Sequence, residues 1–176
     1  DSLDTDTIAY ILEHADTRLL ITDAAFGEAM KTALAQTKNK KIKIIDIIDQ
    51  QASESVSGLR LGKQDYETFL NGADPDYKWQ MPADEWQAMC LNYTSGTSGR
   101  PKGVVYHHRG AYLMAMGTIP VWNMPMHPTY LYVVPLFHCN GWGHAWMMAI
   151  VAGTTICCRK IIAEDIYPLI TDHKVT

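Results

Sequence analysis

The feature that most constrains this chain is the segment 93–103, Tyr-Thr-Ser-Gly-Thr-Ser-Gly-Arg-Pro-Lys-Gly. It gathers hydroxyl side chains, glycines and two cations between the apolar, strand-like segments 89–91 and 104–106. Glycines let backbone N–H groups turn toward an anion, hydroxyls donate further hydrogen bonds, and Lys102 adds a mobile positive charge. The segment therefore predicts a β-hairpin whose loop binds a polyphosphate.

This loop differs from a Walker A loop, which carries Gly-Lys-Ser/Thr and opens directly into a helix. Here Lys102 is followed by Gly103 and then by two valines, a pattern that favours a strand. An ordinary surface turn rich in glycine, serine and threonine is the alternative interpretation. The ordered ending Pro-Lys-Gly favours the phosphate-binding interpretation.

At these residues the chain resembles the phosphate-loop signature of the adenylate-forming (AMP-binding) enzymes, which include acyl-CoA synthetases, luciferases and the adenylation domains of peptide synthetases. A second segment, 133–142, Val-Val-Pro-Leu-Phe-His-Cys-Asn-Gly-Trp, resembles the stretch that lines the acyl pocket in that family. Its form is most similar to the medium- and long-chain fatty acyl-CoA synthetases. The resemblance covers the whole chain, which is similar to an interior piece of the large N-terminal domain.

The resemblance implies an acid–thiol ligase that is part of a longer chain. A carboxylate attacks the α-phosphate of ATP, giving acyl-AMP and pyrophosphate, and CoA then accepts the acyl group as a thioester. The implied partners are a small fatty acid, ATP and CoA, with Mg²⁺ as a cofactor. Two alternatives stay open: another adenylate-forming ligase (an aryl-CoA ligase or a peptide-synthetase domain) and a non-catalytic module that only binds phosphate.

The resemblance also implies the site residues. Lys102 is the expected catalytic residue, and Thr94 is also expected beside Mg²⁺. The expected contacts to the β- and γ-phosphates come from the loop, namely Thr94, Ser95, Gly96, Thr97, Ser98, Gly99 and Lys102. The expected substrate-binding residues are His138, Cys139 and Trp142. Two simpler interpretations remain: His138 as a histidine held by a backbone carbonyl at a strand end, and Trp142 as a core residue.

Several parts of the family have no counterpart here. The magnesium-binding glutamate, the adenine- and ribose-binding segments and the C-terminal lysine with its domain would follow Thr176. We therefore expect the fragment alone to be inactive in acyl-adenylate formation. The acyl chain length also stays undetermined at this stage.

Composition excludes several classes of protein. A net charge of −4 gives no basic surface for nucleic acid. The longest apolar run, 142–156, is interrupted by His144 and Gly153, so no bilayer-spanning segment is expected. The four cysteines have no spacing typical of disulfides or zinc, which favours reduced thiols and a cytoplasmic protein. Apolar surface left uncovered by a missing portion would favour self-association, so a homodimer is one expected state.

The alternation of helix-like and strand-like segments predicts an α/β fold, with layered sheets, flanking helices and parallel strand pairs. We expect residues 1–84 to form a helix/strand segment with a connecting loop, and residues 85–176 to form the phosphate-loop and acyl-pocket segment. The resemblance implies that both belong to one partial N-terminal domain. Helices are predicted at about 5–15, 24–36, 65–70, 108–121, 140 or 141 to 151, and 163–172, and strands at 18–22, 41–49, 130–134 and 154–158.

Four finer expectations follow from local pattern. Thr5 or Asp6 caps the first helix. Residues 50–62 form a loop. Aromatic side chains pin the connecting stretch 71–84 onto the core, and apolar side chains of the last helix point inward. The residues concerned in the last two expectations are Tyr77, Trp79, Trp86, Tyr167 and Ile170.

Overall fold

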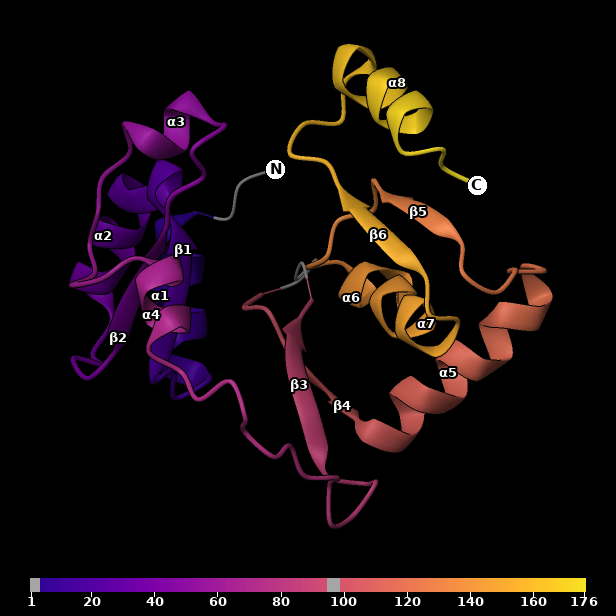
Figure 1. Ribbon diagram of the computed structural model, residues 1–176. Coiled ribbons are helices and arrows are strands. Elements are labelled where there is room, and N and C mark those ends of the chain that lie inside the picture. Colours follow the sequence, from indigo (N-terminus) through magenta and orange to yellow (C-terminus); the bar gives the residue numbers. More distant parts are fainter. Residues whose placement is uncertain (1–3, 95–98) are drawn as a thin grey trace. The chain divides into compact units, whose positions relative to one another are not determined.

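The computed structural model describes residues 4–94 and 99–176, and these form two compact units (Figure 1). The first unit contains residues 4–80 together with 99–101, and the second contains 81–94 and 102–176. Each unit combines helices with short two-stranded sheets. Among the described residues, no helix is both long and apolar enough to cross a membrane.

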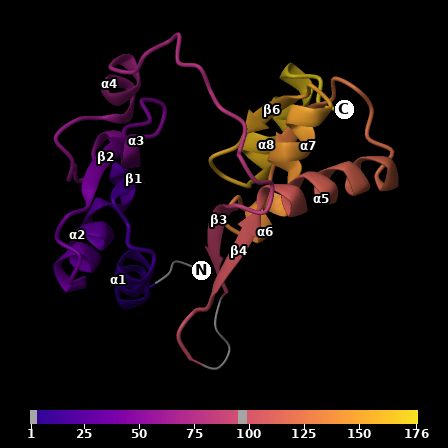
Figure 2. The ribbon, with the colours of Figure 1, turned by 90° about the horizontal axis from the view of Figure 1, so that it is seen from below.

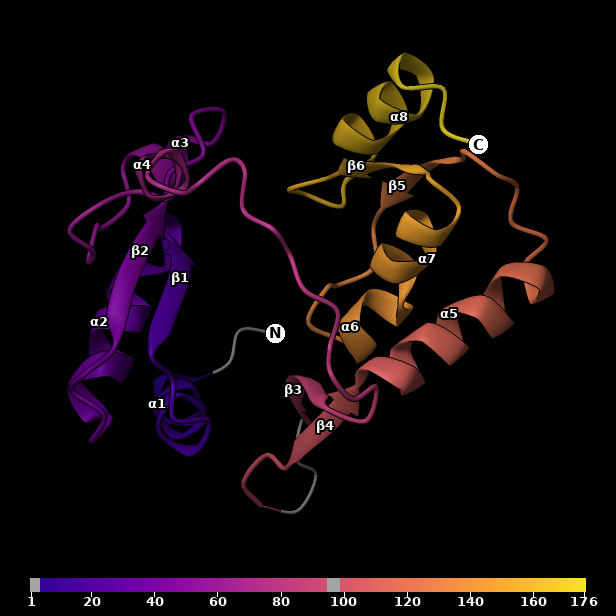
Figure 3. The same ribbon diagram turned by 60° about the horizontal axis from the view of Figure 1, so that its bottom comes forward.

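The first unit is built on two parallel strands, β1 (Leu19–Asp23) and β2 (Lys43–Ile47). A 3₁₀ turn, η1 (Ala24–Phe26), and helix α2 (Gly27–Gln36) connect them, and α2 packs against α1 (Thr5–His14). Figure 3 shows β1 and β2 side by side. The buried side chains of Leu12, Ala33 and Ile45 come from α1, α2 and β2. The parallel pairing predicted from the helix–strand alternation is confirmed here.

Two short helices complete this unit, α3 (Ser53–Val56) and α4 (Tyr66–Asn71). The carboxylate of Asp46, only 2% exposed, accepts hydrogen bonds from the backbone N–H groups of Leu61 and Gly62. The N–H groups of a segment without regular structure are thereby satisfied inside the unit. Asp46 thus fastens the segment between α3 and α4 to strand β2.

Three expectations for the first unit were wrong. Asp4, rather than Thr5 or Asp6, caps α1, because its Oδ1 accepts the N–H of Thr7 at 2.7 Å. The expected loop 50–62 contains helix α3, whose N-cap residue, Ala52, makes no side-chain hydrogen bond to the helix. The side chains of Tyr77 and Trp79 are 72% and 73% exposed and do not pin the connecting stretch.

The second unit begins with an antiparallel hairpin of β3 (Ala88–Tyr93) and β4 (Gly103–His107), in which Tyr93 pairs with Gly103. The predicted hairpin is therefore confirmed. Helix α5 (His108–Val121) follows β4 directly (Figure 2). Strands β5 (Thr129–Tyr132) and β6 (Thr154–Cys157) form a parallel pair.

Helices α6 (Cys139–Trp142) and α7 (His144–Ile150) connect β5 to β6, and α8 (Ala163–Asp172) follows. Helix α7 packs against both α5 and β6. The single helix predicted from 140 or 141 to 151 was wrong, because Trp142 and Gly143 take φ values of 57° and 74° and interrupt it. The side chains of Tyr167 and Ile170 are 69% and 40% exposed, so the expected inward face of α8 was also wrong.

Candidate functional site

The two ends of the predicted phosphate loop are tied together by hydrogen bonds. The N–H of Thr94 donates to the carbonyl of Lys102 at 3.0 Å, and the N–H of Lys102 donates to Oγ1 of Thr94 at 3.1 Å. The first bond continues the backbone ladder of β3 and β4, and the second adds a side-chain contact beside it, so the loop closes at these two residues. Ser95, Gly96, Thr97 and Ser98 lie outside the described residues.

The ends of the loop present groups that suit a polyphosphate. Lys102 is exposed and makes no ion pair within the described part of the chain. Gly99 has a φ of 136°, and a Cβ there would meet no atom within 4 Å. That backbone conformation is open to glycine and strained for other residues. The loop therefore uses its glycine for chain direction at this point, rather than for close packing.

The hydroxyl of Thr94 is the group that was expected beside Mg²⁺. Its hydroxyl oxygen accepts one hydrogen bond, from the N–H of Lys102, and the residue is exposed. A second lone pair stays available, and a hard hydroxyl oxygen is a ligand type that Mg²⁺ accepts. No group of three His, Cys, Asp or Glu side chains that could hold a metal ion occurs among the described residues.

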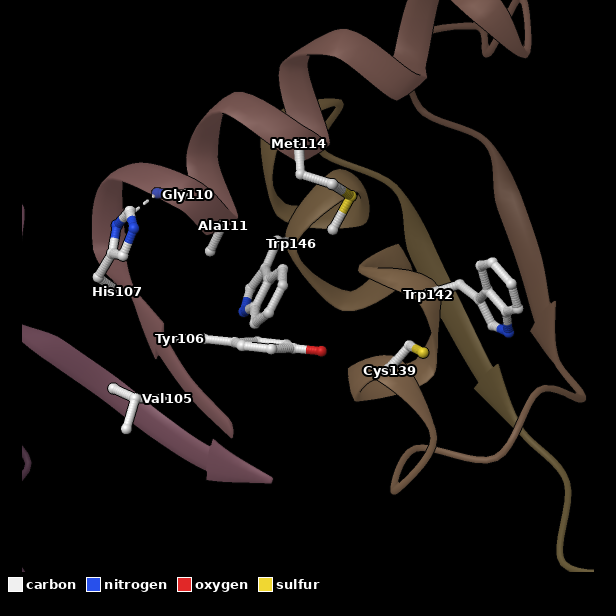
Figure 4. A pocket seen from close by; sticks show the side chains of 9 residues that line it. All are labelled: Val105, Tyr106, His107, Gly110, Ala111, Met114, Cys139, Trp142 and Trp146. Atoms are coloured by element: carbon white, nitrogen blue, oxygen red, sulfur yellow. Dashed lines mark hydrogen bonds between the residues drawn. The ribbon is translucent and has the colours of Figure 1, made fainter. Parts of the chain in front are cut away.

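An apolar cavity of about 320 Å³ lies in the second unit (Figure 4). Figure 4 shows the side chains of Tyr106 and Cys139 facing one another across it. Mostly apolar and aromatic walls are typical of pockets for small molecules. The walls come from β4, α5, α6 and α7 and consist of Val105, Tyr106, His107, Gly110, Ala111, Met114, Cys139, Trp142 and Trp146.

The structure brings two of the three predicted substrate residues to this cavity. Cys139 and Trp142, both on α6, belong to its wall. The Trp142 side chain is 53% exposed, so the core interpretation of that residue is wrong for this chain. His138 is exposed and lies outside the wall, with its ring edge-on to that of Trp142 at 6.1 Å between centroids.

Sequence reasoning missed the role of His107, which lines the cavity and caps α5. Its Nδ1 accepts the N–H of Gly110 at 2.9 Å. The Trp86 ring lies 4.7 Å from the His107 ring, and Arg109 forms an ion pair with Glu85. The available signal was the position of His107 between the predicted strand and the predicted helix, where a capping side chain is needed.

A buried polar cluster holds the turn between α6 and α7. Nδ1 of His144 lies 3.0 Å from the carbonyl oxygen of Gly141, and the Tyr132 hydroxyl donates to the same oxygen at 3.0 Å. Burial lowers the pKa of His144, partly offset by the bond to Gly141. Burial also raises the pKa values of the Tyr130 and Tyr132 phenols. All three groups are therefore neutral at neutral pH.

Comparison with known families gives one match over residues 1–176, to the AMP-binding enzymes. The chain belongs to the AMP-binding enzyme family. The family predicted from the phosphate loop and the acyl-pocket segment is thereby confirmed.

Curated relatives of this AMP-binding enzyme include two CoA ligases. An acetate/butyrate–CoA ligase of Arabidopsis thaliana, named as peroxisomal, is 42% identical over 182 residues, which cover 99% of this chain and 32% of that protein. A 2-methylpropanoate–CoA ligase of Humulus lupulus is 41% identical over 179 residues, with the same coverage of 99% and 32%. The chain thus spans about a third of the length of these relatives.

Solved structures share the fold of this AMP-binding enzyme. A long-chain-fatty-acid CoA ligase of Rhodopseudomonas palustris matches with a TM-score of 0.77 at 19% identity, covering 99% of this chain and 40% of the other. The O-succinylbenzoate CoA synthetase of Bacillus subtilis, in complex with ATP and magnesium, matches with a TM-score of 0.69 at 21% identity, covering 99% and 31%. The predicted α/β class is confirmed by these likenesses.

Proposed function

We propose that the full-length protein is an ATP-dependent acyl-CoA ligase, which joins a carboxylic acid to CoA through an acyl-adenylate. The observation that carries the proposal is the course of β4. This strand leaves the phosphate loop at Gly103 and reaches the apolar cavity through Val105, Tyr106 and His107. One short strand therefore connects the place for ATP to a place for an acyl chain. The names of the curated relatives support the same activity.

In this proposal the chain's own residues act mainly by positioning and by charge. Lys102 stabilises the negative charge that builds on the phosphate oxygens as pyrophosphate leaves. The loop N–H groups and hydroxyls hold the β- and γ-phosphates in line with the attacking carboxylate. Mg²⁺, when bound, neutralises phosphate charge, and Thr94 would be one of its contacts. No general base is required, because the substrate is already a carboxylate.

The cavity supports an aliphatic acid as the substrate. Its volume of about 320 Å³ is at the small end of the range for ligand pockets, roughly 300–1,000 Å³. We therefore propose a short to medium alkyl chain, with Cys139 and Trp142 contacting it and His138 at the side of Trp142. An aromatic acid is the second candidate, because a trans-cinnamate:CoA ligase of Petunia hybrida is 40% identical over 187 residues.

The test is pyrophosphate release by the full-length protein, given Mg²⁺, ATP and one acid at a time, followed by thioester formation with CoA. The panel contains acetate, butyrate, hexanoate, octanoate, cinnamate and a mixture of amino acids. The aliphatic proposal predicts the highest kcat/KM within the first four acids. Highest activity with cinnamate would support the second candidate. Absence of pyrophosphate release with every acid would contradict the proposed function.

Two variants test the loop in the same assay. Lys102→Ala should lower kcat/KM by roughly 10²–10³, the usual loss when one charge-stabilising donor is removed. Arg100→Ala is the matched control, since this exposed cation of the same loop has no proposed role. Equal losses in the two variants would mean that general positive charge matters, rather than the position of Lys102.

Two further properties remain predictions. A homodimer is one expected state, argued from apolar surface that a missing portion would cover, and sedimentation equilibrium of the 176-residue chain beside the full-length protein tests it. The cytoplasmic compartment is predicted as well, although the names of some relatives include the word peroxisomal. Microscopy of the tagged full-length protein distinguishes the two compartments.

A further inference from the structure

His144 is a buried residue that the proposed reaction does not use. It is the first residue of α7 and is 2% exposed. Its ring stacks on that of Tyr130 at 4.6 Å between centroids, and its Nδ1 lies 3.1 Å from the Tyr130 hydroxyl. The same Nδ1 lies 3.0 Å from the carbonyl oxygen of Gly141. His144 therefore links strand β5 to the turn between α6 and α7.

The turn that His144 holds is also part of the cavity wall. Cys139 and Trp142 line the cavity, and they take φ values of 48° and 57°. Such left-handed conformations are unfavourable for residues other than glycine, and they persist only where the surroundings enforce them. The Gly141 carbonyl between these two residues accepts hydrogen bonds from β5 and α7. These two bonds tie the turn to β5 and α7, in addition to local backbone bonds such as that from the Gly141 N–H to the carbonyl of His138.

The surroundings of His144 suit only the neutral ring. Its Nε2 is buried and has no hydrogen-bond partner within the described residues. The titratable groups that face the ring are the phenols of Tyr130 and Tyr132 on β5, while Trp122 at the end of α5 contributes an uncharged ring at 4.9 Å. A proton on Nε2 would create a buried charge without a compensating carboxylate among these groups.

We propose that neutral His144 is a positioning residue for acid binding, which fixes the α6–α7 turn so that Cys139 and Trp142 form the cavity wall. The proposal rests on the proposed acyl-CoA ligase function. It follows that KM for the carboxylic acid depends on His144, while KM for ATP does not. It also follows that acid binding weakens as the pH falls far enough to protonate the ring.

Two variants of the full-length protein separate the polar role of His144 from its bulk. His144→Phe keeps a ring of similar size and removes the bond to Gly141. His144→Asn keeps an amide near the position of Nδ1 and cannot titrate. We expect His144→Phe to raise KM for butyrate or hexanoate roughly tenfold, the size of one lost buried hydrogen bond, with KM for ATP unchanged. His144→Asn should restore KM and remove its rise at acidic pH.

Amide hydrogen exchange gives a readout that needs no activity. Peptides that contain residues 139–143 should exchange faster in His144→Phe than in the wild type, and His144→Asn should restore protection. Should His144→Phe fail to fold, Tyr132→Phe takes its place, because it removes the other hydrogen bond to the Gly141 carbonyl. It should raise KM for the acid and the exchange rate in the same direction.

The outcomes distinguish the inference from the function on which it rests. Faster exchange at 139–143 in a protein that activates no acid would support the role of His144 in fixing the α6–α7 turn and contradict the proposed function. An active protein in which neither KM for the acid nor exchange responds to His144→Phe or Tyr132→Phe would overturn the inference. If KM for the acid depends on pH in His144→Asn as it does in the wild type, the proposal that His144 protonation weakens acid binding is overturned.

Discussion

At the scale of single residues, two glycines of the second unit differ in whether a larger residue could replace them. Gly141 has a φ of 59°, and a Cβ there would lie 1.9 Å from the Tyr132 hydroxyl oxygen. Gly117, on the exposed face of α5, has open space where a Cβ would go. The first glycine is required by both conformation and packing, whereas the second only adds backbone entropy to the unfolded state.

We expect Gly141→Ala to lower the free energy of unfolding by about 2–4 kcal/mol, because the left-handed conformation is strained and Tyr132 must move. Gly117→Ala is the matched control and should raise it by about 0.5–1 kcal/mol, since alanine favours a helix. Urea denaturation of both variants measures the difference. Equal stabilities would mean that the α6–α7 turn rearranges freely.

At the scale of elements, the start of α5 depends on a capping side chain that also lines the cavity. The Nδ1 of His107 satisfies the N–H of Gly110, one of the four donors left unpaired at a helix start. Trp86 covers the His107 ring, and the guanidinium of Arg109 lies 5.6 Å from the Trp86 ring centre. The helix start and one wall of the cavity are therefore held by the same cluster.

His107→Ala should lower the free energy of unfolding by about 1 kcal/mol, the usual loss of a helix cap. His107→Asn should retain most of the stability, because asparagine is a good N-cap residue. Thermal unfolding followed by circular dichroism measures both. A loss that is as large in His107→Asn would assign the effect to the ring contact with Trp86, rather than to the cap.

The link between β2 and the segment before α4 is a second element-scale feature. Asp46 is buried, and its carboxylate accepts hydrogen bonds from the backbone N–H groups of Leu61 and Gly62. Asp46→Ala should lower the free energy of unfolding by about 2–3 kcal/mol, because two part-buried N–H groups lose their carboxylate acceptor. The exposed Asp76→Ala is the control and should change little. Chemical denaturation gives the comparison, and a small loss at Asp46 would show that water replaces the carboxylate.

At the scale of the whole molecule, His144 couples stability to pH. Burial lowers the pKa of His144 below its usual value of 6.5, so the unfolded chain binds this proton more readily than the folded chain. Its contribution to stability is therefore full above pH 6.5 and decreases as the pH falls through the window below that value. The sign follows because the state that binds more protons is favoured by acid.

We expect the free energy of unfolding to fall between pH 7 and pH 5 in the wild type, and to fall less steeply in His144→Asn. Urea denaturation at several pH values measures the slope. His173→Asn, which changes an exposed histidine after α8, is the control and should keep the wild-type slope. A wild-type slope in His144→Asn would assign the pH dependence to other groups.

Much of the element order could be predicted because local pattern determines it. The hairpin around the phosphate loop and the parallel strand pairs follow from short-range signals. Asp65, predicted as the first residue of the helix 65–70, is instead the N-cap of α4: its Oδ1 accepts the N–H of Thr68, and this hydrogen bond lowers the pKa of the Asp65 carboxyl. The exposed state of Tyr77 and Trp79 could not be predicted, because aromatic character alone does not say which surface a side chain meets.

The candidate site also contains residues that local sequence predicts and residues that only the fold brings together. Thr94 and Lys102 were predicted from an ordered string of hydroxyls, glycines and a lysine in one loop, and their contact with phosphate stays a prediction. Of the predicted substrate-binding residues, Cys139 and Trp142 line the cavity and His138 does not, while the cavity residues Tyr106, Met114 and Trp146 were not predicted. Their separation along the chain is too large for any local pattern to connect them.

The sequence alone determined the family, the phosphate-loop hairpin and the alternation of helices and strands, because these depend on residues that are neighbours in the chain. Only the tertiary structure decided that α6 and α7 are separate helices, that His107 caps α5 and that His144 is buried against β5. The physical reason is that conformations such as the left-handed Trp142 are locally unfavourable. They exist because contacts with distant residues, such as Tyr132 with Gly141, stabilise them.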